Sequence, residues 1–283
     1  MHFQPFARTV ESVKNLMASY LLPHGYAAPA PSALLNELRV LPEVGRATAR
    51  LATSCKESRA ESAELTAGGE PVLLIPGFLA GDSTLVAMAR HLRGEGFRTY
   101  RSSIHANVSC TLRTATMLES RLESIAERRG SRVRIVGHSL GGMLARGLAV
   151  RRPDLVSGIV TMGSPVLAPA AHHPLLGRHV GVLVLLAKYG VPQVMSADCV
   201  GGECAREGFE EIRSPMPADV AYTAVWSRND GVVDHRACLD PAAVHVEVPT
   251  SHIGMAFDPR TCDAVSAALH RQLAIDVPDT LAG

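Results

Sequence analysis

The sequence predicts an α/β fold built on a mostly parallel, doubly wound sheet. From residue 72 onward, short apolar runs bounded by turn residues alternate with helical segments, which is the order of βαβ units. The run Val72–Ile75 shows no polar alternation, which indicates a strand buried on both faces. A length of 283 residues with 47% hydrophobic content allows one large core, so we expect a single domain over residues 1–283.

The first 70 residues differ from the rest because they show no alternation of period two. Ser32 is a candidate helix N-cap, and leucines at 34, 35, 38 and 41 have the spacing of a helix with one apolar face. The polar run 55–64, closed by Gly68 and Gly69, is typical of an exposed helix end or linker. Residues 1–70 are therefore expected to form a helical N-terminal extension packed on the main domain.

The elements of the main domain follow from residue 72. Asp82 is expected to begin the first helix and Gly94 to end it. The expected strands are 72–76, 97–100, 133–136, 156–162, 221–226 and 243–248, and the expected helices are 82–93, 111–129, 140–152 and 258–273.

A long connection separates the strands that end at Met162 and begin at Ala221, and it exceeds what a crossover requires. We expect a cap or lid insertion over residues 166–217. Within it the run 179–190 is apolar on most sides, so it suits either a core helix or a lid over an apolar pocket. Both interpretations remain open at this point.

A serine stands between two glycines where the strand 133–136 meets the helix 140–152. A serine hydroxyl becomes a nucleophile when a base removes its proton and a sharp turn exposes its oxygen. Gly137 and Gly141 provide the small neighbours that such a turn requires. Glycine-rich chains produce this pattern by chance, but its place between strand and helix predicts that Ser139 is a catalytic nucleophile.

A base and an acid are expected later in the chain. His252 follows the last strand, in a loop at the carboxyl edge of the sheet, and is the candidate general base, whereas His138 adjoins the serine and must point elsewhere. Asp230 follows the preceding strand, and Gly231 behind it permits a tight turn that aims the carboxylate inward. Asp234 on the same loop is the rival acid, and an Asx turn that only caps its own loop is the alternative role for Asp230.

Five segments carry a resemblance to known proteins: Pro76-Gly-Phe-Leu-Ala-Gly-Asp82, Gly137-His-Ser-Leu-Gly141, Met162-Gly-Ser-Pro165, Ser227-Arg-Asn-Asp-Gly-Val-Val233 and Ser251-His-Ile-Gly-Met255. With them the chain resembles the α/β-hydrolases and, within these, the bacterial lipase-like serine esterases. The order serine, aspartate, histidine is the order of that family's triad. The resemblance implies the α/β-hydrolase fold, and its Asp-Gly-Val-Val arrangement favours Asp230 over Asp234.

The resemblance also implies an oxyanion hole formed by the backbone N–H groups of Phe78 and Leu140. Phe78 has the simpler alternative of core packing. The family more often has His-Gly where this chain has Pro76-Gly77, so a side chain that can brace the loop is missing.

The implied activity is cleavage of carboxylic esters, of short to medium acyl chain or lipids, through a Ser-His-Asp triad and an acyl-enzyme, with no cofactor and no metal. Acyltransferase or thioesterase chemistry with the same triad, and a non-catalytic binding member of the fold, are the alternatives. An apolar acyl pocket is expected from the insertion residues Leu175, Leu176, Val182, Leu183, Val184, Leu185, Leu186, Val191, Val194 and Met195.

The expected partner is a small-molecule or lipid ester. A net charge of +1 with scattered basic residues gives no reason to expect a nucleic acid, and no apolar run reaches the ~20 residues of a transmembrane helix. The first residues lack the features of a secretory signal, so we expect a cytoplasmic protein, of unknown oligomeric state.

Six cysteines are present, and a reducing compartment favours free thiols. Cys199 and Cys204 are separated by four residues and do not match the C-x-x-C of a zinc or redox site, although a disulfide between them is left open. Cys238 and Cys262 bracket the acid and histidine loops, and we hypothesise a disulfide that joins these loops.

Overall fold

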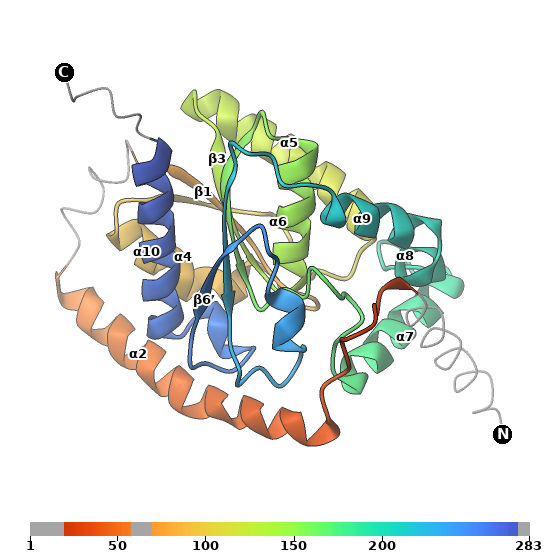
Figure 1. Ribbon diagram of the computed structural model, residues 1–283. Helices are drawn as coiled ribbons and strands as arrows, with labels where there is room; N and C mark the ends of the chain where they lie inside the picture. The colour runs from red at the N-terminus through yellow and green to blue at the C-terminus, as the bar shows by residue number, and fades with distance from the viewer. Residues whose placement is uncertain (1–19, 58–68, 277–283) are drawn as a thin grey trace.

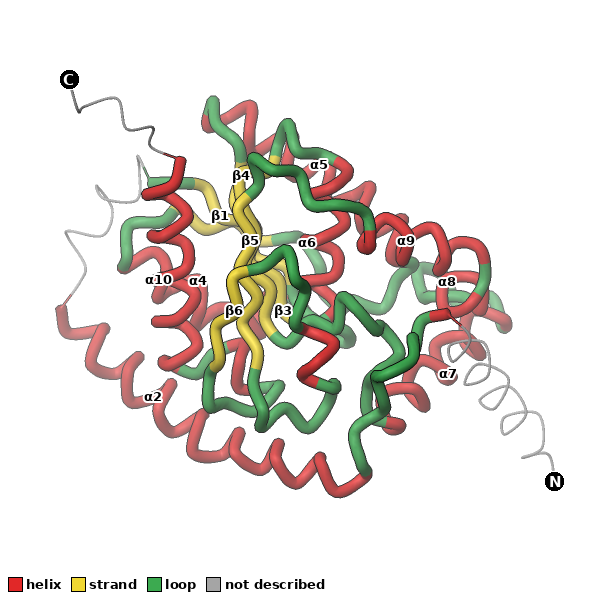
Figure 2. Tube along the Cα trace, viewed as in Figure 1, coloured by secondary structure: helices red, strands yellow, loops and turns green. Residues whose placement is uncertain are grey.

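The computed structural model describes residues 20–57 and 69–276 (Figure 1). Its sheet has the strand order β2-β1-β3-β4-β5-β6, and every neighbouring pair is parallel (Figure 2). The strands are β1 (Pro71–Ile75), β2 (Arg98–Arg101), β3 (Val133–His138), β4 (Val156–Met162), β5 (Ala221–Trp226) and β6 (Val244–Glu247). The predicted parallel sheet is confirmed.

Helices cover both faces of this sheet (Figure 1). On one side lie α4 (Val86–Gly94), which the 3-10 turn η2 (Asp82–Leu85) precedes, and α10 (Pro259–Asp276); on the other lie α5 (Thr111–Arg129) and α6 (Leu140–Arg151). Alternate residues of β1 pack against each layer: Leu73 belongs to the apolar cluster with α5 and α6, and Leu74 to the cluster with α4 and α10. This burial on both faces is the physical reason for the continuous apolar run.

The N-terminal region is helical, as predicted, but it turns a different face to the domain. A 3-10 helix η1 (Pro31–Arg39) continues into α2 (Val40–Glu57), which runs past α10 (Figure 1). Leu35, Leu38 and Leu41 are 66%, 61% and 71% exposed, whereas Glu37 and Glu43 are 8% and 0% exposed. The expected apolar face is therefore wrong, and the buried face consists of Glu37, Glu43 and Ala47.

Two details of this region also differ. The 3-10 helix follows Ala30 without a side-chain cap, so Ser32 is not the N-cap. The expected exposed helix end or linker at 55–64 lies, beyond residue 57, outside the described residues.

Three helices occupy the long connection between β4 and β5: α7 (Pro174–Lys188), α8 (Ala197–Gly201) and α9 (Glu203–Arg213). Helix α9 contacts α5 and α6, so this segment lies against the second helix layer. The short 3-10 turns η3 (His235–Cys238) and η4 (Gly254–Ala256) belong to the loops after β5 and β6. No helix within residues 20–57 and 69–276 combines the length and the hydropathy that crossing a membrane requires.

The hypothesised disulfide between Cys238 and Cys262 is wrong, because both thiols are free. Each is buried in a different apolar cluster: Cys238 packs with Trp226 and Val233, and Cys262 packs with the residues between the sheet and α10. Cys199 and Cys204 are free as well, so the second disulfide is also absent.

Candidate active site

Ser139 lies in a strained turn between β3 and α6. Its backbone has φ 52° and ψ −119°, a left-handed conformation that costs a residue with a side chain about 1–3 kcal/mol. A Cβ atom on Gly137 would lie 2.4 Å from the Gly141 carbonyl oxygen, and one on Gly141 would lie 2.2 Å from the Ile75 carbonyl oxygen. Both glycines are therefore required by the close approach of the strands and the helix, as the sequence predicted.

Asp230 and His252 meet beside this turn. The Asp230 Oδ2 atom is 2.7 Å from His252 Nδ1, and the two residues are 7% and 5% exposed. The other carboxylate oxygen accepts from the backbone N–H groups of Val232 and Val233. Asp230 therefore caps its own loop and also accepts the hydrogen bond from His252. With Nδ1–H donated to the carboxylate, the neutral ring carries its lone pair on Nε2.

Asp234, the alternative acid, has other partners than His252. Asp234 forms an ion pair with Arg236 at 2.6 Å and accepts a hydrogen bond from the Ala27 backbone. The structure therefore brings Asp230, and not Asp234, to the histidine.

The charges around His252 affect its protonation. Burial alone would lower its pKa, but the carboxylates of Asp230 and Glu37 raise the pKa above its usual value. His138 behaves in the opposite way, because burial and the neighbouring His252 lower its pKa to about 3. The neutral His138 ring is hydrogen-bonded through Nε2 to the His252 carbonyl oxygen at 2.9 Å, so it supports the histidine loop.

Gly163, at the end of β4, makes room for the histidine ring. It has φ 57°, and a Cβ atom there would lie 3.1 Å from His252 Nδ1. This contact gives a physical reason for the glycine of the Met162-Gly-Ser-Pro165 segment.

Phe78 and Leu140, the two predicted oxyanion donors, line the same pocket as Ser139. Leu140 is the first residue of α6, so its N–H has no acceptor inside the helix. Among the backbone hydrogen bonds of the described loops and turns, none has the Phe78 or the Leu140 N–H as its donor.

Asn107 supports the loop that carries Phe78, and sequence reasoning missed it. Its side-chain amide donates to the Pro76 carbonyl at 2.9 Å, and its backbone exchanges hydrogen bonds with Leu79 and Ala80. Asn107 is 2% exposed. It therefore provides the bracing side chain that the Pro-Gly sequence lacks.

Glu37 is a second residue that the sequence analysis missed. One of its carboxylate oxygens accepts from the backbone N–H groups of Gly231 and His252, each at 2.9 Å, and the other accepts from Ile253 at 3.0 Å. A single buried carboxylate thus joins the acid loop to the histidine loop.

Glu43 also holds the histidine loop, through Ser251, the residue that precedes His252. It accepts from the backbone N–H and the hydroxyl of Ser251. A Cβ atom on Gly254 would lie 2.0 Å from the Glu43 carboxylate, and one on Gly231 would lie 2.4 Å from the Ala33 carbonyl. Gly231 does not have a positive φ, so its role is to admit the N-terminal helix and not to form a tight turn.

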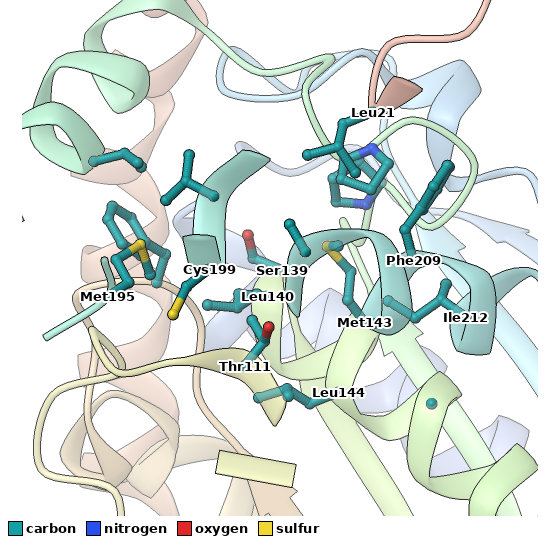
Figure 3. Close-up of a pocket in the computed structure, with 18 of the residues that line it drawn as sticks. Leu21, Thr111, Ser139, Leu140, Met143, Leu144, Met195, Cys199, Phe209 and Ile212 are labelled. Carbon is teal, nitrogen blue, oxygen red and sulfur yellow. The ribbon is translucent and has the colours of Figure 1, made fainter. Parts of the chain in front are cut away.

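An apolar pocket with a volume of about 160 Å³, open to solvent, adjoins Ser139. Figure 3 shows Ser139 and Leu140 between Met195 and Cys199 on one side and Phe209 and Ile212 on the other. Its apolar lining comes from Leu21, Phe78, Leu112, Ala115, Leu140, Met143, Leu144, Leu176, Val180, Met195, Val200, Ala205, Phe209, Ile212 and Val233.

Only some of the insertion residues that were expected to form an acyl pocket line this pocket. Leu176 and Met195 line it, whereas Leu183 and Val184 do not and pack in the buried cluster behind Met195. Leu175, Val182, Leu186 and Val191 are exposed. Many of the missed lining residues lie on α5, α6 and α9, whose inward faces the sequence does not distinguish from core.

Comparisons with known proteins agree with this fold. A family model described as the PGAP1-like alpha/beta domain matches residues 108–179. The mature Bacillus licheniformis lipase BlEst2 is similar in structure, with a TM-score of 0.57 and 14% identity over 71% of this chain and 92% of that chain. The metagenomic carboxyl esterase MGS0156 has a TM-score of 0.56 and 16% identity over 74% and 77% of the two chains.

A third similar structure is the Paleococcus ferrophilus monoacylglycerol lipase, with a TM-score of 0.50 and 18% identity over 73% of this chain and 96% of that chain. No curated protein sequence matches the chain. At these identities the likeness shows the fold, and the predicted α/β-hydrolase fold is confirmed.

Proposed function

We propose that the protein is a serine hydrolase of carboxylic esters, in which Ser139 is the nucleophile, His252 the general base and Asp230 its acid partner. The observation that carries the proposal is the 2.7 Å contact of Asp230 with His252, beside a strained turn whose serine lines an apolar pocket. Similar structures that are named a lipase and a carboxyl esterase add support.

The proposed reaction has two halves. His252 Nε2 takes the Ser139 proton while the serine oxygen bonds the ester carbonyl carbon, and the Phe78 and Leu140 N–H groups donate to the resulting oxyanion. The carbon–oxygen bond to the alcohol then breaks, and His252 returns the proton to that alcohol. A water molecule, deprotonated by His252, then attacks the acyl-serine in the same way. This step releases the acid and restores Ser139.

The apolar lining supports an acyl group of short to medium chain length. Residues 166–217, which contain α7, α8 and α9, would then act as a lid, because their side chains supply part of the pocket wall.

The test is a series of esters of increasing acyl length, assayed with the wild type and with Ser139→Ala. We expect hydrolysis to fall at least about 10⁴-fold in the variant, since it lacks the nucleophile. Ser157→Ala is the matched control, because this buried serine stands near the start of β4 and its hydroxyl makes no hydrogen bond. Hydrolysis that survives Ser139→Ala would refute the mechanism.

Two further measurements separate the alternatives. An added alcohol or thiol that receives the acyl group in place of water would indicate an acyltransferase. An active-site phosphonate that fails to label Ser139 would indicate a non-catalytic binding protein.

A further inference from the structure

Three cysteines lie together at the edge of the pocket. Cys110 directly precedes α5, Cys199 lies in α8, and Cys204 lies in α9. All three sulfur atoms lie within 4.8 Å of one another, and the sulfurs of Cys110 and Cys204 are 3.3 Å apart. Only two of these residues are close in the sequence, so the fold creates the cluster.

The distances fit a shared metal ion better than a disulfide. Zinc binds thiolates at about 2.3 Å in a tetrahedral arrangement, which separates neighbouring sulfurs by about 3.8 Å. A disulfide brings two sulfurs to about 2.05 Å and leaves a third without a bond. Here all three thiols are free and half-buried.

The chain between Cys199 and Cys204 is rigidly built. The Asp198 carboxylate accepts from the Glu203 backbone N–H at 2.9 Å, and the Asp198 carbonyl accepts from Gly202 at 3.0 Å. A Cβ atom on Gly202 would lie 2.2 Å from the Asp198 carboxylate, so only glycine fits this turn. The α8–α9 junction therefore holds both sulfurs toward Cys110 before any ion binds.

The thiols of Cys110 and Cys204 are already in contact, because their sulfurs share a hydrogen bond in which either thiol can be the donor. A metal ion would displace the thiol protons of all three residues, because only thiolates bind it.

We propose that Cys110, Cys199 and Cys204 form a binding site for one soft, thiophilic metal ion, Zn²⁺, whose fourth position is open to water. The ion joins the beginning of α5 to α8 and α9. Since Cys199 also lines the pocket, the site fixes one pocket wall against the helix layer of the sheet.

The test uses the full chain, reduced with a phosphine, stripped with a chelator and titrated with Zn²⁺ alone. We expect one equivalent per chain, and Cd²⁺ in place of Zn²⁺ should give a sulfur-to-metal charge-transfer absorption. Cys110→Ser, Cys199→Ser and Cys204→Ser should each weaken binding more than about 100-fold, since even loss of an outer partner of a metal ligand costs 10–100-fold. Cys262→Ala is the control that removes a buried thiol outside the cluster and should bind like the wild type.

Thermal unfolding gives a second readout. Zn²⁺ should raise the Tm of the wild type and of Cys262→Ala, but not that of the three cluster variants, because binding stabilises only a protein that retains the site. Reduced protein that binds no Zn²⁺, or binding that survives all three substitutions, would overturn the proposal. A Cys110–Cys204 disulfide in protein purified without reductant, together with no Zn²⁺ binding after reduction, would assign the cluster to redox chemistry and overturn it too.

Discussion

Replacing Glu37 tests whether the N-terminal helix positions the candidate active site. The side chain is 8% exposed, and its carboxylate accepts three backbone N–H groups from the loops of Asp230 and His252. Glu37→Ala removes both acceptor oxygens and with them all three hydrogen bonds. Glu37→Gln keeps the shape and one oxygen but turns an NH₂ group toward at least one of the donors.

The size of the effect follows from these bonds. A buried donor left without an acceptor costs about 1–3 kcal/mol, so the loss of acceptors for three donors in Glu37→Ala should lower the free energy of unfolding by about 3–9 kcal/mol. Glu37→Gln should cost about 1–3 kcal/mol, because two of the three N–H groups can keep their acceptor.

The charge of Glu37 adds a pH effect that a purely structural role lacks. His252 must be neutral to accept the serine proton, so kcat/KM for the proposed hydrolysis should rise as the pH increases through the pKa of His252. Asp230 and Glu37 both raise that pKa above its usual value. Glu37→Gln removes one of these charges, so the acid limb of the pH profile should move to lower pH.

Two assays are required: urea unfolding for stability and a pH profile of kcat/KM with a soluble nitrophenyl ester. Glu127→Gln, at an exposed position of α5, is the matched control for the loss of one carboxylate. Unchanged stability together with an unshifted acid limb in Glu37→Gln would refute the positioning role.

Three more predictions follow from the site. Asn107→Ala should lower kcat about 10–100-fold with little change in KM, because the Phe78 donor loses its brace and a lost oxyanion donor costs 10²–10³; steady-state kinetics checks this, and a change in KM alone would contradict it. Phe209→Ala should shift the preferred acyl chain to longer esters in the chain-length series, and an unaltered preference would exclude α9 from the acyl pocket. Asp230→Asn should lower kcat about 10⁴-fold while Asp234→Asn lowers it far less, and comparable losses in both would reopen the choice of acid.

The sequence predicted the sheet well because the signal for a doubly buried strand is local. The bounds of β4, β5 and α5 agree with the expected ranges residue for residue. The sequence could predict that Ser139, Asp230 and His252 lie at one edge of the sheet for a related reason: each follows a strand, and in a parallel sheet the carboxyl ends of the strands share one edge.

The N-terminal region could not be predicted in the same way. Leucine spacing predicts an apolar buried face, yet Leu35 and Leu38 are exposed and Glu37 is buried. The donors that make burial of this carboxylate favourable lie 194 to 216 residues away along the chain, so no local window contains them.

Asn107 and Cys110 were missed for the same reason. Asn107 bonds a loop 31 residues earlier, and Cys110 meets Cys204 across 94 residues. Neither residue belongs to a pattern with a fixed spacing, so only the folded chain identifies its partner.

The link between Glu43 and Ser251 also sets an order of events during synthesis. Ser251 leaves the ribosome 208 residues after Glu43, which at bacterial and eukaryotic elongation rates is about 10–40 s later. During that interval η1 and α2 carry carboxylates whose partners do not yet exist. The candidate site is therefore complete only after the loop with Ser251 and His252 has been translated, and a nascent chain that ends before this loop holds Ser139 without its proposed base.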